Sequence, residues 1–94
     1  MLPNVAQAGS KEKCDCLVTV EPAESVEWIY RGENSQLFAT RTDTLIREIL
    51  ARYGTPKVRL TVEDFGALAF VICARIEVAL ERALEGKILD DIKA

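Results

Sequence analysis

Three nucleophilic side chains of different chemistry lie close together near the start of the chain. Ser10 offers a hydroxyl, Lys13 an amine and Cys14 a thiol, all within the polar segment 8–15. At neutral pH the amine is mostly protonated, because its reference pKa is about 10.4, and the thiol, with a reference pKa of about 8.5, is mostly un-ionised. The apolar run 16–20 follows directly and indicates a strand. A polar lead-in that a strand anchors at once is a suitable place from which a small domain presents a tethered group.

The sequence is poor in the groups that catalysis uses. It has no histidine, which removes the usual general base and every Ser–His or Cys–His pair. The adjacent carboxylates at 63–64 and 90–91 are expected to be solvated or to cap helices, since sequence neighbours do not by themselves make two differently tuned acids. Three cysteines without histidine lack the ligands of a zinc site, and their odd number gives no complete disulfide framework. We expect free thiols, no metal, no catalytic residues and no independent enzyme.

Length and charge indicate one small domain. The 94 residues carry a net charge of −3 with basic and acidic residues interleaved, which does not favour nucleic acid as a partner. The N-terminus lacks the pattern of a signal peptide, and the longest apolar run, 67–74, is far shorter than the roughly 20 residues of a membrane span. We expect a cytoplasmic protein without membrane partners, a single domain over 1–94, a flexible lead-in over 1–13 and a frayed tail over 87–94.

Three segments alternate apolar and polar residues with the period of a strand: 16–20, 26–30 and 58–62. Turn residues separate the first two, and their short connection predicts an antiparallel hairpin. Trp28 and Tyr30 share one face of the second strand, where core packing is favoured over a docking role.

Two helices are predicted around the third strand. Apolar residues recur on one helical face up to Tyr53, with Asn34 or Ser35 as the N-cap and Gly54 as the stop.

The second helix follows Asp64, has apolar residues stepping by three and four over 68–84, and is expected to end at Gly86. The order β-β-α-β-α predicts an α+β fold: a three-stranded antiparallel or mixed sheet with two helices packed on one face.

The segment 8–15 resembles the prosthetic-group segment of the citrate lyase acyl carrier protein (gamma subunit) family. The family pattern is Ala-Gly, a few residues, then Glu-Ser-(Gly/Ser)-Asp running into a strand. Four residues match it: Ala8, Gly9, Glu12 and Asp15. The serine that carries the cofactor falls on Lys13, and its small neighbour falls on Cys14.

Later segments add to this resemblance. Residues 46–54 are similar to the family's long helix and its stop. Residues 58–68 are similar to its last strand and the Asp-(Lys/Phe)-Gly-Ala turn, and residues 74–77 and 81–83 to its final helix. The match covers most of residues 6–84. The turn at 64–67 also occurs in the related acyl carrier subunit of malonate decarboxylase, whereas the first helix favours the citrate lyase branch.

The resemblance implies a non-catalytic acyl carrier. Members of the family hold 2'-(5''-phosphoribosyl)-3'-dephospho-CoA through a phosphodiester to serine, and its thiol carries an acetyl or citryl thioester between larger transferase and lyase subunits. Three residues are candidates for attachment: Lys13, which is aligned with the serine but chemically unsuited, Cys14 and Ser10. Asp64 and Phe65 are candidates for docking.

Two alternatives stay open. A carrier-fold scaffold or docking protein without prosthetic group is favoured by Lys13 in place of the serine. An acyl carrier of malonate decarboxylase is slightly favoured by Phe65 in the turn.

Overall fold

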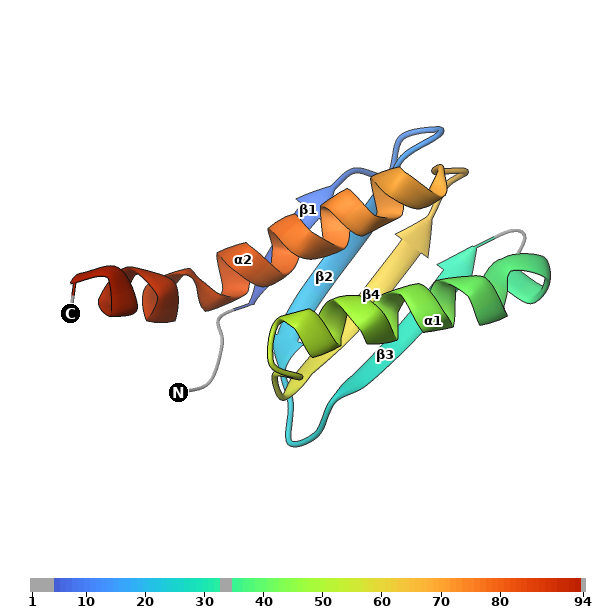
Figure 1. The fold of residues 1–94 in the computed structure, drawn as a ribbon. Helices are drawn as coiled ribbons and strands as arrows, with labels where there is room; N and C mark the ends of the chain where they lie inside the picture. Colours follow the sequence, from blue (N-terminus) through green and yellow to red (C-terminus); the bar gives the residue numbers. More distant parts are fainter. Residues whose placement is uncertain (1–4, 33–34, 94) are drawn as a thin grey trace.

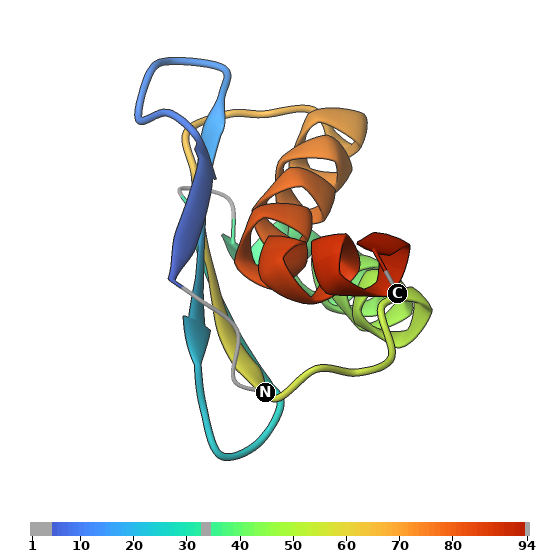
Figure 2. The same ribbon diagram turned by 90° about the vertical axis from the view of Figure 1, so that its left-hand side faces the viewer.

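The protein is a four-stranded sheet covered on one face by two helices (Figures 1 and 2). The computed structural model of the chain describes residues 5–32 and 35–93. Its elements, in chain order, are β1 (Ala6–Gly9), β2 (Cys16–Pro22), β3 (Glu27–Gly32), α1 (Ser35–Arg52), β4 (Val58–Asp64) and α2 (Ala69–Lys93). The strands lie in the order β1-β2-β4-β3; β3 and β4 are parallel and the other neighbours are antiparallel. The predicted α+β class, with two helices on one face of a mixed sheet, is confirmed.

The core lies between the sheet and the helices. α2 covers β1 and β2, and α1 covers β3 (Figure 2). On the central strands every second side chain faces the helices and is fully buried: Cys16, Val18 and Val20 on β2, and Val58, Leu60 and Val62 on β4. The helices oppose them with apolar faces that include Ile46, Ile49, Leu50, Ile76 and Leu80. Burial of each such aliphatic side chain contributes about 1.5–3 kcal/mol, so this two-layer contact is what holds the sheet to the helices.

The sheet has a fourth strand that the sequence pattern does not predict. β1 lies within residues 1–13, which are expected to be a flexible lead-in, and it pairs with β2 from Ala6 opposite Val20 to Gly9 opposite Leu17. Its sequence, Ala-Gln-Ala-Gly, lacks the β-branched and aromatic residues that mark strands. The strand forms because β2 supplies a partner and because Ala8 is small enough to be buried under α2.

The predicted hairpin of segments 16–20 and 26–30 is wrong, because these segments form β2 and β3 and β4 lies between them in the sheet. Pro22 of β2 pairs with Val58 on one side of β4, and Glu27 of β3 pairs with Arg59 on the other. The chain between β2 and β3 must cross the width of β4, a distance of about 10 Å. Residues 23–26 bridge it, since each extended residue reaches about 3.3 Å. β4 occupies a central position with its inward side chains fully buried, whereas β3 forms an edge.

The ends of the helices agree only in part with the expectations. α1 begins at Ser35 and stops at Gly54, which has a φ of 79°, whereas Asn34 lies outside the described residues. The predicted stop at Gly86 is wrong, because α2 continues helically to Lys93 and extends past the sheet (Figure 1).

Trp28 and Tyr30 pack against the core, as expected. None of the described helices is both long and apolar enough to span a bilayer.

Candidate functional site

The loop between β1 and β2, residues 10–15, carries all three candidate attachment residues at one end of the sheet (Figure 1). Gly9 leads into it with a φ of 98°, and a Cβ at this position would lie 1.9 Å from the carbonyl oxygen of Cys16. The backbone N–H of Ser10 donates to that same oxygen over 3.1 Å. Only glycine permits this approach of the two strands, so the loop leaves the sheet from a fixed point.

Asp15 fastens the other end of the loop. Its Oδ1 accepts a hydrogen bond from the backbone N–H of Cys16 (2.7 Å), and its Oδ2 accepts one from the Ser10 hydroxyl (2.8 Å). Arg75 of α2 adds a bidentate contact, donating from Nε to Oδ1 and from Nη2 to Oδ2 over 3.1 Å each. The Cys16 N–H, then Ser10 and Arg75, lower the pKa of Asp15 below its ordinary value. One carboxylate therefore ties β2, the loop and α2 together.

Ser10 is part of this fastening. Its hydroxyl donates to Asp15 and also accepts from the backbone N–H of Glu12 over 3.2 Å. A group attached to this oxygen would remove the donor from Asp15. Ser10 is therefore placed as a structural residue of the loop rather than as a free nucleophile.

Lys13 and Cys14 lie at the exposed tip of the loop. Within the part of the chain that the structure describes, neither side chain has a hydrogen-bond or ion-pair partner. Cys14 has a φ of 67°, and its backbone N–H donates to the carbonyl of Phe65 over 2.8 Å. The backbone at the tip is thus held while the thiol faces solvent.

The other two thiols differ in environment from Cys14. Cys16 is fully buried, and loss of solvent raises its pKa to about 11. Cys73 on α2 is half-buried, and desolvation raises its pKa as well. All three cysteines are free, as expected, and Cys14 is the accessible one.

The turn at 64–67 lies directly beside the loop. Asp64 Oδ1 accepts from the backbone N–H groups of Gly66 (3.0 Å) and Ala67 (2.8 Å), and its Oδ2 accepts from the Tyr30 hydroxyl. Burial, followed by the hydrogen bond to Asp64, raises the pKa of Tyr30. Of the two predicted docking residues, Asp64 is engaged within the turn, whereas the side chain of Phe65 is 39 % exposed.

Sequence reasoning about the site missed the contributions of Arg75 and Tyr30, and the exposed Leu68 and Phe70 beyond the turn. No local pattern marked Arg75, because its partner Asp15 lies 60 residues away in the sequence. Among the described residues, no cluster of three or more His, Cys, Asp or Glu side chains that could hold a metal ion is present.

Comparisons with known proteins cover nearly the whole of this fold. A family model described as "ACP: Malonate decarboxylase delta subunit (MdcD)" matches residues 4–83. The citrate lyase acyl carrier protein of Haemophilus influenzae (strain PittEE) is 33% identical over 84 residues, covering 89% of this chain and 88% of the relative. The chain belongs to this family of acyl carrier proteins.

Two further relatives carry the same name. The citrate lyase acyl carrier protein of Rhodopseudomonas palustris (strain BisA53) is 35% identical over 81 residues, covering 85% of this chain and 84% of the relative. That of Treponema denticola is 34% identical over 80 residues, covering 85% and 92%. No solved structure matches the chain. The predicted family is confirmed, and with it an acyl carrier role that involves partner enzyme subunits.

The attachment position of the family does not offer a serine hydroxyl in this acyl carrier protein. Lys13 has no hydroxyl, and a bond from phosphate to its amine would be a phosphoramidate. The Ser10 hydroxyl is engaged by Asp15. The exposed thiol of Cys14 is the free nucleophile nearest to the family's attachment position.

Proposed function

We propose that the chain is the acyl carrier subunit of a cytoplasmic citrate-lyase-type complex, and that it presents an acetyl or citryl thioester to larger transferase and lyase subunits without catalysing a reaction itself. The observation that carries the proposal is the exposed tip of loop 10–15, which stands where the resemblance puts the attachment residue. The names of the relatives favour citrate over malonate as the substrate of the complex.

The physical basis of this role is tethering. A thioester held on the carrier stays at high effective concentration beside the subunits that act on it, and no diffusion step separates the two reactions. The carrier must supply an accessible point of attachment on a stable body. The hydrogen bonds of Asp15 and Gly9's close approach to β2 support that requirement.

The arm that the resemblance implies, phosphoribosyl-dephospho-CoA, needs a nucleophile on this loop. We assign Cys14 as the first candidate, because its thiol is exposed and, among the described residues, unpartnered at the tip. Its bond to the arm would be a phosphorothiolate ester in place of the family's phosphodiester, formed as the thiol loses its proton and the phosphate of an activated arm loses its leaving group. Ser10 is the second, because its hydroxyl must leave Asp15 before it can react. Lys13 is exposed but mostly protonated at neutral pH.

Intact mass of the chain isolated from its native host tests attachment. A mass increase that corresponds to the arm supports the carrier, and Cys14→Ala and Ser10→Ala, made separately in the host, identify the residue. Loss of the added mass in Cys14→Ala alone is the expected result. Retention in both variants would rule out both residues.

An unmodified chain in an active complex would favour the second candidate function, a carrier-fold scaffold that docks larger subunits. The observation behind this alternative is Lys13 in place of the family's serine. The third candidate, an acyl carrier of malonate decarboxylase, is favoured by the description of the matching family model. Assay of the native complex with citrate and with malonate separates these two acyl carriers.

A further inference from the structure

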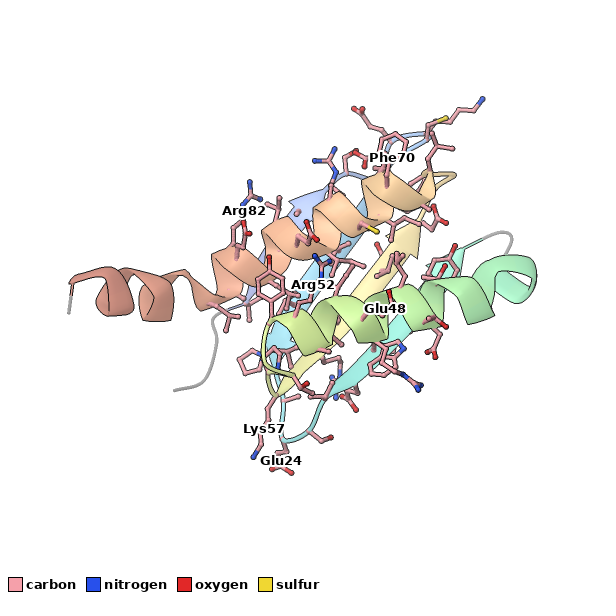
Figure 3. All side chains as sticks on the ribbon, in the orientation of Figure 1. Glu24, Glu48, Arg52, Lys57, Phe70 and Arg82 are labelled. Atoms are coloured by element: carbon pink, nitrogen blue, oxygen red, sulfur yellow. The ribbon has the colours of Figure 1, made fainter. Side chains whose placement is uncertain are left out.

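Three exposed apolar side chains gather where the 64–67 turn leads into α2. Phe65 is 39 % exposed, Leu68 63 % and Phe70 69 %, and we call these three residues the α2-start patch. Figure 3 shows Phe70 near the first turn of α2, at the same end of the molecule as the loop between β1 and β2.

The patch is not explained by the core of the domain. The buried face of α2 includes Ile72 and Ile76, at 5 % and 0 % exposure, whereas Leu68, which the sequence pattern places on the same face, precedes the helix and is exposed, contrary to that expectation. Large apolar side chains such as these three lose, while they stay in water, the free energy that burial would give them, and neighbouring exposed apolar residues of this kind mark interaction sites.

The patch and the tip of loop 10–15 form one connected surface. The carbonyl of Phe65 accepts from the N–H of Cys14 (2.8 Å), and the N–H of Phe65 donates to the carbonyl of Asp15 (2.9 Å). Arg75, one and a half turns along α2 from Phe70, holds the carboxylate of Asp15. A subunit that approaches the loop tip therefore meets Phe65 of the patch beside it.

Three carboxylates around the patch have partners within the protein. Asp15 is paired with Arg75, Asp64 accepts from its own turn, and Glu63 lies 4.0 Å from Lys11. These carboxylates have little capacity left for strong ionic contacts with a partner. The patch itself is thus complementary to an apolar recess, and it lies beside a loop tip that keeps the charge of Lys13, unpaired among the described residues.

We propose that the α2-start patch docks the carrier onto a larger subunit of its own complex, in an apolar recess beside the opening through which that subunit receives the acyl group. This inference rests on the proposed function and adds the surface that brings the loop tip to the enzyme. The patch uses Phe65 from the predicted docking pair and adds Leu68 and Phe70, while Asp64 acts only by shaping the turn.

Binding measurements with the host's purified lyase and transferase subunits test the docking surface. The full-length unmodified chain is titrated by calorimetry against each subunit, as the wild type and as Leu68→Ser or Phe70→Ser. Matched controls are Val5→Ser and Ile29→Ser, since these apolar residues are 65 % and 39 % exposed but lie before β1 and on β3. Each patch variant should weaken binding about 10-fold or more, and each control less than about 2-fold.

The possible results separate cleanly. Equal binding of patch variants and wild type overturns the docking surface and leaves the carrier role intact. A wild type that binds neither subunit overturns both this inference and the proposed function. If sedimentation shows that the chain alone is a dimer and that Phe70→Ser makes it a monomer, the patch is covered by a second copy and the inference is wrong. Thermal unfolding by circular dichroism checks every variant, and Leu68→Ser carries the test if Phe70→Ser does not fold.

Discussion

Replacement of Gly9 with alanine should destabilise the protein far more than the same replacement at Gly54. Both residues have a positive φ, 98° and 79°, which a residue with a Cβ adopts at a cost of about 1–2 kcal/mol. Alanine also restricts the unfolded chain, which offsets about 0.4–1 kcal/mol. The conformational contribution is therefore a loss of about 1 kcal/mol at either position.

Space makes the two positions differ. Around a Cβ at Gly54 no atom lies within 4 Å, whereas a Cβ at Gly9 would lie 1.9 Å from the carbonyl oxygen of Cys16, far inside the 3.0 Å that real Cβ atoms keep. β1 must move away from β2, and this movement breaks the hydrogen bond from Ser10 N–H to the same oxygen. Loss of a partly buried backbone hydrogen bond costs about 1–3 kcal/mol, so Gly9→Ala should lose about 2–4 kcal/mol and Gly54→Ala about 1 kcal/mol.

Urea unfolding followed by the fluorescence of Trp28, the one tryptophan of the chain, measures both variants. A domain of this size has a total stability of about 5–15 kcal/mol, so the expected difference moves the midpoint clearly. Equal losses in the two variants would refute the claim that close approach of β1 and β2 fixes the start of the loop.

Three further predictions concern the same end of the molecule. Asp15→Asn should destabilise the protein near neutral pH. Since the pKa of Asp15 in the folded protein lies below 3.8, the stability advantage of the wild type should be complete above that value and should disappear as the pH falls through the folded pKa. Urea unfolding of both proteins across this pH range measures the advantage, and a constant difference in unfolding free energy would contradict the contacts of the ionised carboxylate. Iodoacetamide should label Cys14 in the folded protein and Cys16 only on unfolding, because Cys16 is buried and has a pKa of about 11. Peptide mapping gives the order in which the two cysteines are labelled, and early labelling of Cys16 would show that β2 is not packed as described. Tyr30→Phe should lower the free energy of unfolding in urea by about 1–2 kcal/mol, because it removes the hydrogen-bond donor to the carboxylate of Asp64. Tyr53→Phe, which removes the more exposed hydrogen bond to Glu81, is the milder control. Equal losses in the two variants would argue against a special role of the Tyr30 hydrogen bond.

Local periodicity was enough to predict the central strands and the helical faces. Residues 16–20 and 58–62 alternate because one side of each strand is buried under the helices and the other is not. The same asymmetry explains why both helices could be placed on one face of the sheet.

Strand order and the first strand could not be predicted in this way. β1 has no strand signal of its own, because its stability comes from pairing with β2 and from burial of Ala8 under α2. Whether β3 or β4 lies beside β2 depends on how each strand packs with the rest of the domain. The short connection between β2 and β3 is only a local cue and carries no information about that packing.

The site shows the same division between local and long-range information. The three nucleophiles before β2 were predicted from composition and family resemblance, but as part of a lead-in and not of a loop between two strands. The pair of Asp15 and Arg75 joins residues that are 60 apart in sequence, and no spacing rule connects a loop carboxylate with a helix arginine at that distance. Their contact could be found only once α2 was placed over β2.

The fastened loop also bears on how an acyl group would travel. Only residues 11–14 lie between the hydrogen-bonded positions of Ser10 and Asp15, and even Cys14 is held through its backbone to Phe65. A group bound directly to the Cys14 thiol would therefore have little more reach than one side chain. Two larger subunits could act on it only if each admitted the loop tip itself into its active site. A long arm removes that requirement, because it moves the thioester away from a body that the subunits cannot both enclose. An active complex with an unmodified carrier therefore has two explanations: a scaffold that carries nothing, or a carrier whose loop tip is inserted deeply into each subunit. Protection of Cys14 from iodoacetamide in that complex would indicate insertion, and labelling of Cys14 would indicate the scaffold.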